Sequence, residues 1–416
     1  MSLGAMPNSI FNNKNIAFFN PRQDFATNPS LLCLTEEFIK HNAHVDVYMP
    51  GLYMRGCGRY PPLEGNISQY PFPRKLEFWA GEVGKTLSNW KWYFVHSSWK
   101  AERILKEKKY DLVFGIDSEG IIAAYQYASR NRVPIVYICY EIIFRDELLR
   151  RSDYKEKDSE IKASQRADMV IIQDKWRAKL LADENNLDEQ QFIYLPVSPR
   201  SSSTIQRTNY LRKRFNIPNG KIVVLHSGSF EDWTYAEELI DSVPKWPEKV
   251  VLVIHTRYSP VKKHKYISRI QENNFENIIL STEPLYRQAY EQMVASADIG
   301  LVLYKKRPVF KSLQKNIETI GFSSGKFSYY MKYGLPVIAA GGGTYHELLK
   351  EYHFGISLNS FDEMPEALSK VISCYQKHSD EAKRLFSEKL AFDLYWPATS
   401  RKLAHLLRSR NHRIAW

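Results

Sequence analysis

Short apolar runs alternate with helix-patterned stretches along most of the chain. Residues 14–19 form an apolar run, residues 31–43 repeat apolar side chains at helical spacing, and residues 45–49 form a second apolar run. The next apolar runs lie at 110–117, 133–141, 167–174 and 191–196. Strands that alternate with helices predict a parallel sheet that is covered by helices on both faces. The first half of the chain is therefore predicted to be a doubly wound α/β domain.

A Ser-rich stretch, residues 197–210, interrupts this alternation and has no apolar period. Linkers have this composition, so we interpret the stretch as the connection between two domains. A second alternating series follows, from KIVVLHSG at 221–228 to GISLN at 355–359. The predicted fold class is α/β, with two Rossmann-like doubly wound domains over residues 1–200 and 211–392.

The region from residue 51 to residue 109 departs from the alternating pattern. Residues 51–74 are rich in Gly, Pro and Tyr and are predicted to form one long loop. Residues 74–109 combine four tryptophans, at 79, 90, 92 and 99, with many basic residues. This mixture is typical of a surface that faces a membrane or an acceptor. Core tryptophans beside solvated lysines would give the same pattern, so both interpretations stay open.

The charge balance narrows the possible partners. Lys and Arg together number 58 and Asp and Glu 46, which gives a net charge of +12. Such an excess suits phosphates, anionic sugars, nucleic acid or an anionic membrane surface. The chain has no helix-turn-helix, zinc-finger or RNP pattern, so we expect no nucleic-acid partner. A basic loop could cover or steer an anionic substrate, or be simply solvated; it contains Lys305, Lys306, Arg307, Lys311 and Lys315.

The cysteines and the N-terminal residues indicate the cellular compartment of the protein. Four cysteines are scattered without a pairwise motif, which argues against a disulfide framework or a zinc ribbon. The first residues, MSLGAMPNS, lack the regions of a secretory signal, and no stretch approaches the ~20 apolar residues of a membrane span. We therefore expect a cytoplasmic protein, with peripheral contact to the inner face of the membrane through the basic Trp-rich surface as an option.

The strongest local motif is a Gly- and Ser-rich turn at residues 321–325. The residues after it have helical spacing, so a helix is predicted to begin at Ser324 or Gly325. The unpaired N–H groups and the dipole of a helix start form an anion site that suits a diphosphate, and Lys326 would add a full charge. Gly-rich turns also join helices to strands without any ligand, so the motif alone leaves both interpretations open.

The order of elements and several motifs resemble those of GT-B-type glycosyltransferases, close to the bacterial glycosyl transferase group 1 or family 4-like enzymes. The main strings are ADIGLVLY at 297–304 and GFSSGKFSYYMKYGLPVI at 321–338, and the resemblance extends over nearly the whole chain. It implies that the two domains face each other across a cleft. It also implies that the basic C-terminal helices, residues 393–416, pack back onto the first domain.

The resemblance implies that the second domain holds a sugar nucleotide. Its expected donor-binding residues are Ser227, Gly228, Arg257, Tyr304, Gly321, Phe322, Ser323, Ser324, Gly325 and Lys326. Among them, residues 324–326 would contact the diphosphate and residues 321–323 the donor sugar, while Tyr304 would pack on the base or ribose. Many relatives carry two glutamates eight positions apart in this region, but this chain has Gly321 and Tyr329 there. Neither residue can act as a carboxylate, which puts the usual sugar and ribose contacts in question.

Candidate catalytic groups follow the predicted strands of the first domain. They are Glu141, Asp117 and Asp24, with Asn20 and Arg22 expected on the acceptor side. A carboxylate in such a place can act as a base for an acceptor hydroxyl, hydrogen-bond a sugar or cap a helix. No HExxH or DxD motif is present, so we expect no metal site and no cofactor besides the nucleotide sugar. A helix start and basic side chains can stabilise a leaving diphosphate instead.

The function predicted from these residues and this resemblance is transfer of a hexose from a nucleoside diphosphate sugar, with UDP or GDP as the carrier, to an acceptor hydroxyl. The expected acceptor is a glycan or a lipid-linked precursor, in cell-surface glycan or exopolysaccharide synthesis. Three alternatives remain: a sugar-nucleotide epimerase, a phosphorylase of the same fold, or a non-catalytic glycan- or nucleotide-binding module. The missing glutamate pair is the best support for the last of these.

Overall fold

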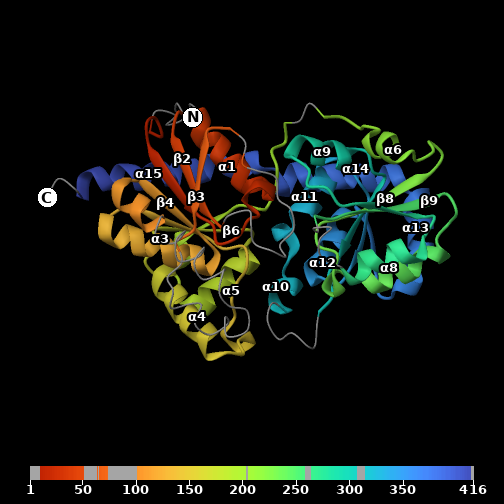
Figure 1. Ribbon diagram of the computed structural model, residues 1–416, viewed down its shortest axis with the longest axis horizontal. Coiled ribbons are helices and arrows are strands. Elements are labelled where there is room, and N and C mark those ends of the chain that lie inside the picture. The colour runs from red at the N-terminus through yellow and green to blue at the C-terminus, as the bar shows by residue number, and fades with distance from the viewer. Residues whose placement is uncertain are drawn as a thin grey trace.

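The computed structural model describes residues 10–50, 63, 65–73, 101–202, 205–257, 264–306 and 314–413. The described chain forms two lobes that lie side by side, and each is built around one parallel sheet (Figure 1). The last strand of the first sheet ends at Tyr194, and the second sheet begins at Ile222. The predicted fold class, two doubly wound α/β domains, is confirmed.

The N-terminal lobe has a seven-stranded sheet in the order β3-β2-β1-β4-β5-β6-β7. Its strands are β1 (Asn15–Phe19), β2 (His44–Met49), β3 (Ile67–Pro71), β4 (Leu112–Ile116), β5 (Ile135–Ile138), β6 (Met169–Ile172) and β7 (Phe192–Tyr194). Its helices are α1 (Pro29–Lys40), α3 (Asp117–Asn131), α4 (Arg151–Ser164) and α5 (Lys175–Asn185). The strand order reverses between β1 and β4, and open α/β sheets bind ligands at such a point.

The C-terminal lobe has a six-stranded sheet in the order β10-β9-β8-β11-β12-β13, which reverses between β8 and β11. Its strands are β8 (Ile222–Ser227), β9 (Val250–His255), β10 (Ile278–Ser281), β11 (Ile299–Leu303), β12 (Val337–Ala340) and β13 (Gly355–Leu358). Its helices are α6 (Tyr210–Phe215), α7 (Ala236–Ser242), α8 (Lys265–Asn273), α9 (Arg287–Ala295), α10 (Gln314–Glu318), α11 (Gly325–Lys332), α12 (Gly343–Tyr352), α13 (Met364–Ser373) and α14 (Tyr375–Leu385).

Helices cover both faces of each sheet, and this explains the apolar runs of the sequence. All residues of β4 and β9 are buried, for example, because each strand faces a hydrophobic core on both sides. Strands of this kind read as continuous apolar runs and do not alternate with polar residues. The apolar runs therefore predicted the central strands of both sheets.

One predicted element is wrong, because part of the long loop expected over residues 51–74 is strand β3. This strand pairs in parallel with β2 at the edge of the sheet. Its residues are exposed or half-buried, so it lacks the apolar run that marks the central strands. Residues 51–62, residue 64 and all four tryptophans of the 74–109 stretch lie outside the described residues.

The last helix, α15 (Phe392–Arg413), returns from the second lobe to the first (Figure 1). Trp396 and Leu403 belong to the same core cluster as the buried residues of β1 and β4. The backbone N–H of Phe392 donates a hydrogen bond to the carbonyl of Pro199 (3.1 Å). The chain thus crosses between the lobes twice, once after β7 and once immediately before α15.

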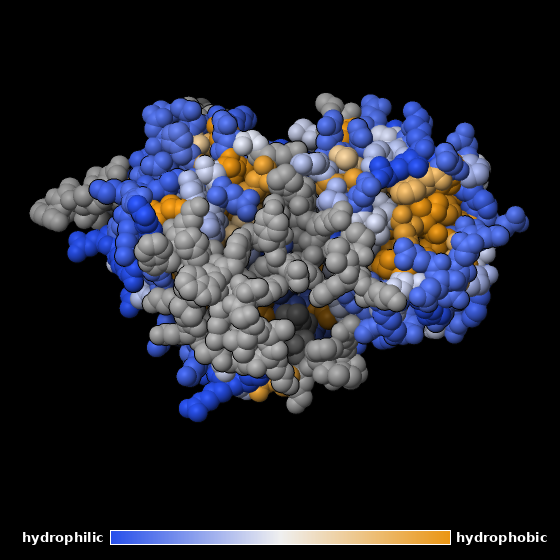
Figure 2. Space-filling model, in the orientation of Figure 1, coloured by the Kyte–Doolittle hydropathy of each residue, from blue (hydrophilic) through white to orange (hydrophobic). Residues whose placement is uncertain are grey.

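The described surface is largely hydrophilic around the rims of both lobes, and the most extensive apolar area in this view lies on the face of the C-terminal lobe (Figure 2). Among the described residues, no helix combines the length and the apolar character needed to cross a bilayer. Cys33, Cys139 and Cys374 are free thiols, and the first two are buried.

Candidate active site between the two lobes

Two adjoining cavities lie between the lobes. The larger cavity has a volume of about 630 Å³ and the smaller one about 420 Å³. Residues of both lobes line each cavity, and Arg22, Glu141 and Trp233 line both. The lining segments follow β1, β4 and β5 of the first sheet and β8, β9 and β11 of the second. These are carboxyl ends of strands beside the reversals of strand order, where ligands of doubly wound folds bind.

The first turn of α11 forms one wall of the larger cavity. Ser324, Gly325 and Lys326 line the cavity there, and no side chain caps the helix. The orphan backbone N–H groups and the positive end of the helix dipole therefore face this space. Lys326 has no carboxylate partner within the described chain, and burial lowers the pKa of its ammonium group to about 7. A cation held in this way beside a helix start is suited to bind an anion.

The turn after β8 forms the next part of the same wall. Gly228 has a φ of 105°, and a Cβ added there would have no atom within 4 Å. The glycine is therefore needed for its backbone conformation, and its backbone lies open to the cavity. Beside it, the Ser227 Oγ lies 2.8 Å from the Tyr290 hydroxyl. This arrangement lets a ligand approach the main chain closely.

The C-terminal wall of the larger cavity carries cations and, among its described lining residues, no carboxylate. Its basic side chains are those of Arg257, Arg287 and Lys326. Arg287 also forms ion pairs with Glu36 of α1 and with Glu291. An excess of positive charge in a partly closed cavity attracts anions. The wall thus fits a multiply charged anion such as a diphosphate.

The aromatic ring of Tyr304 lies against Lys326. The Tyr304 ring centroid lies 4.8 Å from the Lys326 ammonium nitrogen, and the Tyr304 hydroxyl lies 2.9 Å from the Ser324 Oγ. Trp233 stacks on Tyr304 with 5.9 Å between ring centroids. Tyr329 also lines the cavity. The Tyr304 ring packs against the ammonium group without neutralising its charge, so the charge can bind a ligand.

Two histidines near this wall are neutral at physiological pH. Burial lowers the pKa of His226 and of His255 to about 3. His255 lines the larger cavity, whereas His226 is fully buried behind it and contacts the carbonyl of Ser229. Neither ring can therefore supply positive charge to a phosphate near neutral pH.

The N-terminal wall is built around an ion pair. The Arg22 guanidinium donates two hydrogen bonds to the Glu141 carboxylate, one of them 2.7 Å from Nη1 to Oε1 and the other from Nη2 to Oε2. Burial alone would raise the pKa of Glu141, but the charge of Arg22 outweighs it and lowers that pKa. Glu141 is therefore ionised at neutral pH and lies where the two cavities meet.

Asp117 supports this ion pair from behind. Its Oδ1 accepts hydrogen bonds from the backbone N–H groups of Tyr140 (2.7 Å) and Glu141 (3.0 Å). Burial raises the pKa of Asp117 to about 7, although Arg22 lies 3.9 Å away. Asp117 also has a φ of 53°, which is uncommon for a residue other than glycine. Its side chain does not cap its own helix, α3, but holds the segment that carries Glu141.

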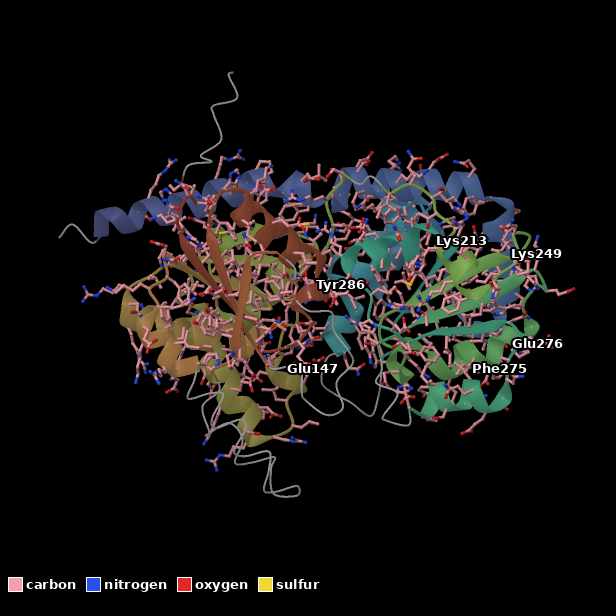
Figure 3. All side chains as sticks on the ribbon, turned by 45° about the horizontal axis from the view of Figure 1, so that its top comes forward. Glu147, Lys213, Lys249, Phe275, Glu276 and Tyr286 are labelled. Carbon is pink, nitrogen blue, oxygen red and sulfur yellow. The ribbon has the colours of Figure 1, made fainter. Side chains whose placement is uncertain are left out.

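A hydrogen-bonded bridge joins the two lobes beside the smaller cavity. Asn316 of α10 donates to the carbonyl of Ile142 (2.7 Å) and accepts from its N–H (2.9 Å). The Glu147 carboxylate, labelled at the boundary of the lobes in Figure 3, accepts from the backbone N–H of Lys315 (2.9 Å). Helix α10 is thus fixed to the segment that follows Glu141.

The structure brings most of the predicted site residues together around the two cavities. The lining residues include Asn20, Arg22, Asp24, Asp117, Glu141, Ser227, Gly228, Arg257, Tyr304, Ser323, Ser324, Gly325 and Lys326. Asn20 is buried and shapes the loop after β1, because its side-chain amide donates to the carbonyl of Arg22 (2.7 Å) and to Asp24 (3.4 Å).

Gly321 and Phe322 do not line either cavity, which differs from the expected donor-sugar contacts. A Cβ added at Gly321 would lie 2.6 Å from the Thr344 Cγ2, so a longer residue does not fit there without a shift. The carbonyl of Phe322 accepts a hydrogen bond from the N–H of Val197 (2.8 Å). Gly321 therefore packs within the C-terminal lobe, Phe322 contacts the segment that follows the first sheet, and Ser323 alone of the three reaches the cavities.

The described part of the basic loop does not reach the larger cavity either. Lys305 pairs with Glu238 and Lys306 with Glu318, while Lys315 pairs with Asp146 at 2.7 Å. These lysines neutralise carboxylates of the protein. The remaining basic residues of the loop lie outside the described residues.

Several cavity residues were not predicted from the sequence. They include Trp233, Tyr290 and Arg287 on the C-terminal side and Asn28 and Arg177 on the N-terminal side. Tyr290 and Arg177 lie within helices whose apolar spacing suggested only packing. Trp233 follows β8 by a few residues, as a ligand-contacting loop residue would, and this position was the available signal.

The comparisons with known proteins agree with this geometry. Residues 266–395 match the family described as glucosyltransferase 3-like, C-terminal domain. No curated protein matches the chain in sequence. HepE from Anabaena, solved with UDP and glucose, is similar in structure with a TM-score of 0.65 at 14% identity; the match covers 95% of this chain and 100% of that one.

Two synthases have similar structures. Sucrose-phosphate synthase from Thermosynechococcus elongatus matches with a TM-score of 0.65 at 12% identity, over 95% of this chain and 99% of that one. An alpha,alpha-trehalose 6-phosphate synthase from Burkholderia multivorans matches with a TM-score of 0.64 at 11% identity, over 97% of this chain and 100% of that one. Part of the C-terminal lobe thus matches a glucosyltransferase-like domain family, and the chain as a whole has the fold of these GT-B structures. The resemblance found in the sequence is confirmed for the fold.

Within the described residues, no group of three or more His, Cys, Asp and Glu side chains is arranged to hold a metal ion. The basic groups of the larger cavity are the ones placed to neutralise a phosphate charge. Metal independence remains a prediction.

Proposed function

We propose that this protein is a glycosyltransferase that transfers a hexose, with glucose as the first candidate, from a UDP-sugar to an acceptor hydroxyl. The matching family is described as glucosyltransferase 3-like, and HepE was solved with UDP and glucose, which supports this choice of donor. The larger cavity would hold the nucleoside diphosphate, and the acceptor would enter through the smaller cavity.

The observation that carries the proposal is the charge of the C-terminal wall. Lys326 and Arg257 line the larger cavity beside the uncapped start of α11, and the described residues on this wall include no carboxylate. In the transition state the bond between the anomeric carbon and the diphosphate breaks, and negative charge grows on the leaving oxygen. Fixed positive groups that meet this charge lower the barrier. Lys326 becomes fully charged once a diphosphate binds, because an anion raises the pKa of a neighbouring ammonium group.

The N-terminal wall would handle the acceptor. Glu141 is ionised and lies at the junction of the cavities, so it would accept a hydrogen bond from the acceptor hydroxyl and take its proton as the new C–O bond forms. The diphosphate leaves with the electron pair of the broken bond. Asp117 acts as a positioning residue, because it holds the backbone of Glu141 through two N–H groups.

We extend the proposal to the setting of the reaction, as expected from the sequence: synthesis of a cell-surface glycan or exopolysaccharide on a glycan or lipid-linked acceptor, at the cytoplasmic face of the membrane and without a metal ion. The net charge of +12 supports contact with anionic partners.

Calorimetry with UDP-glucose, GDP-mannose and dTDP-glucose tests the donor, and slow release of the nucleoside diphosphate from the bound donor tests turnover. We expect UDP-glucose to bind and to be hydrolysed slowly without an acceptor. Binding without any turnover, on any donor or with acceptor extracts, would favour the non-catalytic binding module. No binding of any nucleotide sugar would contradict the proposal.

A further inference from the structure

The two arginines of the smaller cavity are both occupied by the protein itself. The first, Arg22, gives both terminal nitrogens to the two oxygens of Glu141. A bidentate pair of this kind is among the strongest side-chain contacts in proteins. A phosphate in the cavity could use Arg22 only by displacing a carboxylate that already matches its geometry.

The second arginine, Arg177, is saturated. A guanidinium group has five N–H donors. Here Nε donates to Gln173 (2.8 Å), Nη2 donates to the carbonyl of Tyr140 (2.7 Å) and to Asn316 (3.0 Å), and Nη1 donates to the hydroxyl (3.3 Å) and carbonyl (3.5 Å) of Thr319. The side chain is 1% exposed. Arg177 therefore ties the lobes together and has no donor left for a ligand.

The carboxylates outnumber these arginines in the smaller cavity. Asp24, Asp117 and Glu141 line it, and its lining residues include no lysine. A phosphate group placed here would meet carboxylates and paired guanidinium groups, whereas the larger cavity offers Lys326 without a carboxylate partner. Burying an anion without a charge partner is strongly unfavourable.

The rest of the smaller cavity suits a sugar ring. Its wall includes the half-buried Trp233 and the apolar side chains of Leu31 and Ile317, together with the amide of Asn28. Small-molecule sites commonly combine apolar and aromatic walls with a few placed polar groups. The flat ring of Trp233 fits the apolar face of a pyranose, while amides and carboxylates bind hydroxyl groups.

We infer that the acceptor group that enters the smaller cavity is an uncharged, hydroxyl-bearing sugar and not a sugar phosphate. The inference rests on the proposed function, because it assumes that this cavity receives the acceptor. It separates this chain from two of its structural neighbours, which are by name synthases of sugar phosphates.

Matched pairs of sugars test the inference on the full chain loaded with UDP. Saturation-transfer NMR would compare glucose with glucose 6-phosphate and mannose with mannose 6-phosphate. We expect the uncharged member of at least one pair to receive several times more saturation than its phosphate. Equal or stronger saturation of the phosphates would overturn the inference, and so would the absence of saturation on every uncharged sugar.

A variant that frees Arg22 sharpens the test. In Glu141→Gln the guanidinium loses its charge partner, so we expect the 6-phosphates to gain affinity by about fivefold or more. The matched control is Glu283→Gln, which removes the partner of another arginine, Arg214, outside both cavities. A similar gain in both variants, or none in Glu141→Gln with its thermal unfolding unchanged, would contradict the inference. The pairs measured on the unsubstituted chain decide the question if Glu141→Gln does not fold.

The measurement of UDP binding distinguishes failure of the proposed function from failure of the inference about the acceptor. If calorimetry detects no UDP or UDP-glucose binding, the proposed function fails and the inference fails with it. If UDP binds and the phosphates are preferred, only the inference fails.

Discussion

The two lobes share one kind of sheet topology but present opposite chemistry to the space between them. After β8, β9 and β11 the C-terminal lobe places cations and an uncapped helix start, with no carboxylate among the described lining residues. After β1, β4 and β5 the N-terminal lobe places carboxylates, and its exposed arginine is already paired. Each lobe therefore offers a ligand site at the carboxyl ends of its strands, and the residues at those strand ends decide which ligand binds there.

Substitution of Glu141 is the strongest way to break this comparison. Glu141→Gln keeps the size of the side chain but removes the base, so we expect the transfer rate to fall by about 10²–10⁴-fold. The affinity for UDP-glucose should change little, because the donor binds mainly to the other wall. Initial rates and calorimetry measure the two effects. A loss of donor affinity as large as the loss of rate would show that donor binding and proton removal are not assigned to separate walls.

Substitution of Lys326 tests the C-terminal wall of the larger cavity. Lys326→Met should weaken UDP-glucose binding by about 10- to 100-fold, because a charge-assisted contact to the diphosphate is lost. The control is Lys306→Met, which removes the same charge from a surface residue that pairs with Glu318. Calorimetry compares the variants, and equal losses in both would point to general electrostatic attraction instead of a defined site.

The pH dependence of donor binding sharpens the role of Lys326. Since its pKa is lowered to about 7 in the free protein, the charged form that binds phosphate is lost as the pH rises through 7. UDP-glucose itself does not titrate in this range, so its affinity should fall by about tenfold between pH 6 and pH 8. The same titration of Lys326→Met should be flat. A flat profile for the unsubstituted chain would contradict the assignment.

Substitution of Trp233 should give the smallest effect. Trp233→Leu removes the aromatic platform shared by the cavities, and such contacts contribute about 0.5–1.5 kcal/mol, so the acceptor KM should rise by about two- to tenfold. The donor affinity should change less than the acceptor KM. Steady-state kinetics with each substrate varied in turn separate the two, and the reverse order would place Trp233 on the donor side.

Much of the fold could be predicted from the sequence because the central strands are buried on both faces. Each then reads as an apolar run, and the helices between them follow. Strand β3 was not predicted because it lies at the edge of the sheet, where its residues are exposed or half-buried and form no apolar run. Pairing at an edge depends on a neighbouring strand that the local pattern does not reveal.

The positions of candidate residues could be predicted where a local motif marks them. The Gly- and Ser-rich turn marks the start of α11 beside Lys326, and Glu141 follows an apolar strand; both residues line a cavity. The hydrogen bond from Arg177 to Asn316, which joins the two lobes, was not predicted, because the two residues lie 139 positions apart in the chain. The packing of Gly321 against Thr344 was not predicted for a similar reason, since Thr344 comes close only through the tertiary fold.

The return of α15 to the first lobe has a consequence for how the chain is made. Trp396, Leu403 and Leu407 complete the core around β1 and β4, although they follow the whole second lobe in the chain. Domains usually fold in order as they leave the ribosome. Here the core that α15 shares with the first sheet can close only after α15 has been synthesised, and α15 follows the second lobe in the chain. The apolar face of the first sheet therefore has to stay unassembled while the whole second lobe is translated and folds.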